Sequence, residues 1–91
     1  MQKKKVTRPP KTIYAPAYRV LLDILRARRK AAKLTQRALA EKLGVPHTWV
    51  AKVEIGERRL DVLEMIRVLR VLGADPVAVV RTLVEAERES G

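Results

Sequence analysis

The segment 34–56 constrains the fold more than any other part of the chain, because it predicts two short helices joined by a tight glycine turn. Thr35 is suited to cap the first helix with its hydroxyl, and Leu34 and Leu39 occupy the two positions that pack around such a cap. Gly44 is expected to end this helix, since glycine adopts the left-handed conformation without steric cost. The chain can then reverse within a few residues and begin a second helix.

The second helix of this segment, from about Pro46 to Gly56, is predicted to have one buried face and one outward face. Val50 and Val53 are three residues apart, so their side chains share the inward side of the helix. The opposite side carries polar residues that can form hydrogen bonds in solvent or in a groove, namely His47, Thr48 and Lys52.

These residues make the segment similar to the helix-turn-helix of Cro and the lambda-type phage repressors, the XRE-like transcriptional regulators. The resemblance rests on Thr35-Gln36, Leu39-Ala40, Leu43-Gly44-Val45, Val50, Val53, Glu54 and Gly56. It extends from about Tyr18 to Leu83 and implies an all-α, five-helix lambda-repressor-like DNA-binding domain. The sequence departs from the family at Pro46, where Ser or Thr is usual. Proline lacks the capping hydroxyl, but its φ suits the start of a helix.

Apolar periodicity predicts a helix before this unit and two after it. The first begins near Pro16 and runs to about Lys33, with an apolar stripe of Ala17, Leu21, Ile24, Leu25 and Ala32. The next follows a capping-box pattern formed by Asp61 and Glu64 and ends at Gly73, with a predicted core face of Val62, Met65, Ile66, Leu69 and Leu72. The last begins at Asp75-Pro76, and its apolar positions at helical spacing are Val77, Val80, Leu83 and Val84.

Positive charge is concentrated in the first part of the chain. Residues 1–37 contain twelve Lys or Arg and one acid, which gives +11, and residues 38–91 contain eight against nine acids, which gives −1, for a total of +10. Residues 1–13 are rich in Lys and Pro and are predicted to be a basic flexible arm, followed by one DNA-binding domain over 14–91. The arm is expected to lie along DNA phosphates, although it could simply be a solubilising tail.

The resemblance also assigns roles to individual residues. The family positions that touch base edges correspond to His47, Thr48 and Lys52. The family also places a residue at the position of Gln36 against a phosphate, and further phosphate contacts are predicted from Arg37, Arg58, Arg59, Lys3, Lys4 and Lys5. Arg37, Arg58 and Arg59 could equally be solvated loop charges. Trp49 is open to two interpretations, since its ring can pack over the preceding helix or cover a sugar-phosphate edge.

Two structural roles are predicted outside the reading helix. Arg29 extends the apolar stripe of the first helix with a charge, and the resemblance pairs it with Glu54 in an ion pair, although Arg29 could instead extend to solvent. The last helix has more apolar width than one domain needs. We therefore expect a homodimer interface containing Val79, Val80 and Leu83.

Several function classes find no support in the composition. The chain has no cysteine, one histidine and no glycine-rich phosphate loop, so the sequence predicts no enzyme, no metal site, no cofactor and no small-molecule ligand. It contains no stretch of membrane-span length, and the absence of cysteine suits a cytoplasmic protein. The expected partner is double-stranded DNA.

Together these features predict a sequence-specific transcriptional regulator, repressor-like and homodimeric on a palindromic operator. One alternative is an antitoxin-like module of the same fold that also binds a toxin protein. A second is a nonspecific nucleic-acid-binding protein that relies on the basic arm, although the aromatic residues expected of a single-strand binder are scarce.

Overall fold

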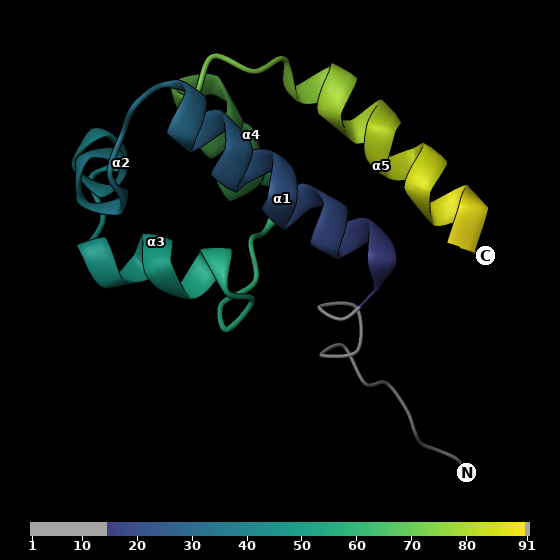
Figure 1. The fold of residues 1–91 in the computed structure, drawn as a ribbon, viewed down its shortest axis with the longest axis horizontal. Helices are drawn as coiled ribbons and strands as arrows, with labels where there is room; N and C mark the ends of the chain where they lie inside the picture. Colours follow the sequence, from purple (N-terminus) through teal and green to yellow (C-terminus); the bar gives the residue numbers. More distant parts are fainter. Residues whose placement is uncertain (1–14, 91) are drawn as a thin grey trace, which may run out of the picture.

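The computed structural model describes residues 15–90, and five α-helices are the regular elements of that part of the chain (Figure 1). They are α1 (Pro16–Ala31), α2 (Gln36–Leu43), α3 (His47–Glu54), α4 (Val62–Val71) and α5 (Pro76–Ser90). This is the all-α, five-helix architecture that the sequence predicts. The proposed basic arm, residues 1–13, lies outside the described residues. Over residues 15–90, none of the helices combines the length and the hydrophobicity of a membrane-spanning segment.

Helix α1 lies at the centre of the domain, with α3 along one edge and α5 along the other (Figure 1). It packs against both, while α2 packs against α3 and α4, and α4 also contacts α5. All five helices contribute to one core, whose buried apolar residues are Leu21, Leu25, Leu39, Ala40, Val50, Val53, Val68, Leu69, Leu72, Ala74 and Val79. Because α2 and α3 both supply side chains to this core, the helix-turn-helix is held rigidly against α1 and α4.

Side-chain caps begin the helices where the sequence predicts them. The Thr35 hydroxyl accepts a hydrogen bond from the backbone N–H of Ala38 at 3.0 Å. At α4, Asp61 and Glu64 form a reciprocal capping box, each side chain accepting from the other residue's backbone N–H. Each such cap contributes on the order of 1 kcal/mol and fixes the residue at which its helix starts.

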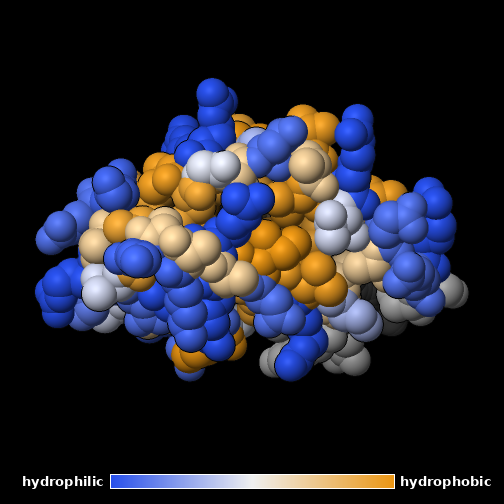
Figure 2. Space-filling model, turned by 45° about the horizontal axis from the view of Figure 1, so that its top comes forward, coloured by the Kyte–Doolittle hydropathy of each residue, from blue (hydrophilic) through white to orange (hydrophobic). Residues whose placement is uncertain are grey.

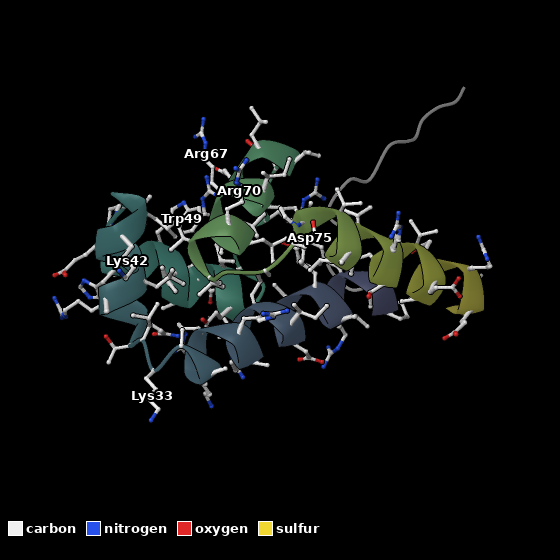
Figure 3. All side chains as sticks on the ribbon, turned by 90° about the horizontal axis from the view of Figure 1, so that it is seen from above. Lys33, Lys42, Trp49, Arg67, Arg70 and Asp75 are labelled. Atoms are coloured by element: carbon white, nitrogen blue, oxygen red, sulfur yellow. The ribbon has the colours of Figure 1, made fainter. Side chains whose placement is uncertain are left out.

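A residue in the left-handed conformation follows each of the first four helices. Three of these residues are glycines, at positions 44, 56 and 73, and the fourth is Lys33 after α1, with φ 60°. The same hydrogen-bond pattern closes α1 and α2, since Leu34 N–H donates to the Arg29 carbonyl and Val45 N–H donates to the Ala40 carbonyl. Lys33 lies in the turn from α1 into α2 (Figure 3). Its side chain makes the left-handed conformation cost about 1–2 kcal/mol, which the contacts of the turn must offset.

The structure corrects two details of the predicted core faces. Val62 on the first turn of α4 is exposed, and Val68 occupies the core in its place. On α5, Val79 and Leu83 face inward, whereas Val77, Val80 and Val84 are exposed. Val79 was predicted to lie in a dimer interface, and this is wrong because its side chain, 7% exposed, belongs to the core of the single domain.

Candidate nucleic-acid interface

Helix α3 presents one polar face to solvent while its other face is fixed in the core. Val50 and Val53 are buried, as their three-residue spacing predicts, and they anchor the helix from behind. His47, Thr48 and Lys52 are all exposed on the opposite side. The side chains that the sequence assigns to base reading are therefore brought together on one surface of one helix.

Two apolar residues extend this face and were not singled out from the sequence. Ala51 is half-buried, and Ile55, which follows the last turn of α3, is 62% exposed. They lie three and seven residues after Thr48, so helical spacing alone places them on the same side. That spacing is the signal that could have identified them. Small and branched apolar groups on such a face are suited to contact a thymine methyl.

Behind α3, Arg29 and Glu54 form a buried ion pair. The Arg29 guanidinium donates to both carboxylate oxygens, from Nε at 2.6 Å and from Nη2 at 3.1 Å. Their side chains are 10% and 3% exposed. Nη1 of Arg29 also donates to the Leu34 carbonyl at 2.8 Å, so one side chain of α1 ties together the start of α2 and the end of α3. The guanidinium does not extend to solvent.

Two further groups converge on the same carboxylate. Gln36 donates from its amide to Glu54 Oε1 at 2.9 Å, and Arg26 Nε lies 3.6 Å from that oxygen. Burial alone would raise the pKa of Glu54, but the hydrogen bonds from Arg29 and Gln36 and the nearby arginine charges lower that pKa below its ordinary value of 4.5. Glu54 is therefore ionised at neutral pH, and it connects α3 to α1 through Arg29 and to α2 through Gln36.

The residues predicted to hold phosphates have different surroundings. The side-chain amide of Gln36 donates a hydrogen bond to Glu54, and Gln36 is the first residue of α2, as predicted. Arg37 and Arg59 are exposed. Lys3, Lys4 and Lys5 lie outside the described residues.

Arg58 and Trp49 are both engaged within the domain. The Trp49 ring is half-buried against the core, which fits the packing interpretation of this residue, and the Arg58 guanidinium carbon lies 4.9 Å from its ring centroid. Arg58 also donates to both carboxylate oxygens of Glu64, at 3.0 and 2.9 Å. The hydrogen bond from Arg58 lowers the pKa of Glu64, and the same contact raises the pKa of Arg58.

Comparison with known proteins places this architecture in a family. Residues 21–83 match a family described as a helix-turn-helix domain. Among solved structures, the chain is similar to an XRE-family like protein from Pseudomonas syringae pv. tomato str. DC3000, with 43% sequence identity and a TM-score of 0.75, covering 87% of this chain and 96% of that one. No curated protein matches the sequence. Because both matches span the helix-turn-helix and the helices packed around it, the chain belongs to the helix-turn-helix family of XRE-like DNA-binding regulators.

Proposed function

We propose that this regulator binds double-stranded DNA sequence-specifically and acts as a repressor-like homodimer on a palindromic operator. The observation that carries the proposal is the arrangement of α3. Its outward face exposes three hydrogen-bonding side chains, while Val50, Val53 and Glu54 fix the helix from behind. A helix held rigidly with polar groups outward is what reading base edges in the major groove requires.

Each exposed side chain suits a particular feature of a base pair. The Lys52 ammonium can donate to O6 and N7 of guanine, the commonest type of specific contact. Thr48 can bond a base edge or pack its methyl group on thymine, and His47 can donate or accept according to its tautomer. Ile55 adds an exposed apolar group at the far end of the same face.

Phosphate contacts would surround this reading face and fix its register on the duplex. Exposed Arg37 lies in the first turn of α2, and exposed Arg59 follows α3, so the two flank the reading helix in the sequence. The amino-terminal lysines would add a sequence-independent contribution that depends on salt. The high positive charge of residues 1–37 supports phosphate binding by this part of the chain.

The dimer contact is assigned to the outward face of α5. Val77, Val80 and Val84 follow one another at spacings of three and four residues and remain 60%, 40% and 49% exposed. Apolar residues gather in the middle of one face of the domain, with hydrophilic side chains at both ends (Figure 2). Because α5 lies on the other side of α1 from α3 (Figure 1), a two-fold contact through α5 would leave both reading helices free for DNA.

Replacing Lys52 with alanine tests the reading role. We expect Lys52→Ala to lose about 1–3 kcal/mol of binding free energy on a selected operator, to relax the preference at one base pair and to leave binding to a scrambled duplex nearly unchanged.

Deleting the amino-terminal arm should instead lower the affinity for both duplexes alike. It should also flatten the dependence of log affinity on log salt by roughly 0.9 for each phosphate that the arm no longer neutralises. Fluorescence anisotropy on the two duplexes measures both quantities.

A matched control is Lys30→Ala, which removes the same exposed charge from α1. If Lys52→Ala lowered the affinity for both duplexes equally and behaved like Lys30→Ala, Lys52 would act through its charge alone. The proposal that Lys52 reads a base would then be wrong.

A further inference from the structure

Arg58 was predicted to hold a phosphate, but its guanidinium is already surrounded by partners within the domain. Two of its nitrogens form a bidentate pair with the Glu64 carboxylate, and Nη1 also donates to the Arg59 carbonyl at 2.9 Å. Its guanidinium carbon lies over the ring of Trp49, 4.9 Å from the ring centroid. A planar guanidinium can lie over an indole ring and form two parallel hydrogen bonds to a carboxylate at the same time, whereas the ammonium group of lysine lacks this fixed two-donor geometry.

The same residue is bonded to the reading helix through its backbone. The N–H groups of Glu57 and Arg58 both donate to the carbonyl of Lys52, at 2.9 and 3.2 Å. Arg58 therefore contacts α3 twice, once at the residue assigned to guanine and once at Trp49, and contacts α4 through Glu64. The other end of this loop is held by the Leu60 N–H, which donates to the Tyr18 hydroxyl of α1 at 3.1 Å.

Glu64 is itself fixed in place by its role in the capping box. Its Oε1 accepts from the Asp61 N–H at 3.0 Å while also accepting from Arg58. The carboxylate that binds Arg58 thus has a defined position at the start of α4, and α4 is anchored in the core by Val68 and Leu69. The chain of contacts through Arg58 to Glu64 begins at Trp49 on the first turn of the reading helix and at Lys52 on its last turn, so it links the reading helix to a rigid element.

We propose that Arg58 is a positioning residue for sequence reading and not a phosphate ligand. Trp49, Arg58 and Glu64, here called the Arg58 clip, hold α3 at a fixed angle to α4 and thereby set where Lys52 and Ile55 stand in the major groove. The inference rests on the proposed function. Since the Arg58 and Glu64 side chains are 38% and 25% exposed, the clip adds little to global stability, and its effect is local orientation.

The two roles of Arg58 predict opposite results when Glu64 is changed to glutamine. Glutamine is also accepted at this capping-box position, so Glu64→Gln keeps the start of α4 while removing the charge that holds Arg58. If Arg58 positions α3, the ratio of affinities for a selected operator and a scrambled duplex should fall about tenfold, within the range expected when one base contact is removed. The salt slope should be unchanged.

If Arg58 holds a phosphate, releasing it from Glu64 should strengthen binding. Glu64→Gln would then bind both duplexes more tightly and steepen the log-log salt slope by about 0.9, the value for one additional neutralised phosphate. Glu85→Gln is the matched control, because it removes the same charge from an exposed pair with Arg88 on α5. Comparing the two variants separates the clip from the general effect of removing one acid.

Trp49 gives a second readout that needs no DNA. It is the only tryptophan of the chain, so the emission of the free protein reports directly on the ring that Arg58 covers. Glu64→Gln and Arg58→Lys should both change this emission, since each breaks the bidentate contact that keeps the guanidinium over the ring. Glu85→Gln should leave the emission as in the wild type.

The proposal is supported if Glu64→Gln lowers the affinity ratio and alters Trp49 emission while Glu85→Gln does neither. It is overturned if Glu64→Gln keeps the wild-type ratio, keeps the wild-type emission, or binds both duplexes more tightly than Glu85→Gln does. A wild-type protein with no preference for any duplex would instead contradict the proposed function itself. The failure of the clip and the failure of sequence reading therefore give different results.

Discussion

Replacing Glu54 with alanine should lower the free energy of unfolding by about 3 kcal/mol, the largest effect expected of any single polar substitution in this domain. The reason is that three groups converge on this buried carboxylate. Without it, the buried Arg29 guanidinium keeps only its hydrogen bond to the Leu34 carbonyl, its charge is left unpaired, and the half-buried Gln36 amide loses its acceptor. Urea denaturation followed by far-ultraviolet circular dichroism measures the change.

A double-mutant cycle tests whether the pair acts as a unit. Arg29→Ala should cost about as much as Glu54→Ala, and the double variant should cost far less than the sum of the two, because removing both partners leaves no stranded charge. The exposed pair of Glu85 and Arg88 is the control, and breaking it should cost less than about 0.5 kcal/mol. Small and additive losses at Arg29 and Glu54 would show that the pair does not stabilise the fold.

The same carboxylate should make stability depend on acid pH. Its pKa is lower in the folded protein than the ordinary value of 4.5, so the unfolded chain takes up the proton more readily. The contribution of Glu54 is therefore fully present above about pH 4.5 and is lost as the pH falls through the folded pKa. The difference in the free energy of unfolding between the wild type and Glu54→Gln should become smaller as the pH falls through that acid range. A gap that stayed constant would contradict this assignment.

Introducing a charge on the outer face of α5 should abolish cooperative operator binding. If Val80 lies in a two-fold contact, Val80→Glu would place two carboxylates in an apolar interface, where neither is solvated. The two half-sites would then be bound independently, and operator affinity should fall about 100-fold, the lower end of the gain that linked sites provide. Sedimentation equilibrium should show a monomer at concentrations where the wild type is dimeric.

Thr82→Glu is the matched control for Val80→Glu. Position 82 is also exposed on α5, but it lies on the opposite side of the helix from the valine stripe, so the variant adds the same charge without touching the proposed contact. Unchanged mass and operator affinity in Val80→Glu would mean that the half-sites are joined through another surface.

Local signals in the sequence predicted the helices and their limits well. Thr35, Asp61 and the glycine at position 44 act through hydrogen bonds or backbone conformations within a few residues of themselves, so their roles can be read from neighbouring positions. The same holds for Val50 and Val53, whose spacing gives the buried side of α3 directly. The resemblance to the XRE-like family placed Arg29 beside Glu54.

Interactions between distant segments could not be predicted in the same way. The apolar residues of α5 are numerous enough that periodicity allows more than one inward face, and only packing against α1 and α4 decides that Val79 is buried and Val77 is exposed. Likewise, the Gln36 side chain is suited to phosphate, and nothing near it in the sequence shows that its amide donates to Glu54, which lies 18 residues away. Such pairings depend on tertiary structure.

Selection of bound sites from a pool of random duplexes tests the central claim most directly. A homodimer that reads bases with α3 should enrich one palindromic sequence, with half-sites about one helical turn apart, and the enriched site should be bound about 10³-fold or more tightly than a scrambled duplex. The same selection with Lys52→Ala should lose the preference at one position in each half-site. A wild-type pool that stays random after repeated rounds, with equal affinity for all duplexes, would contradict sequence-specific recognition by this domain.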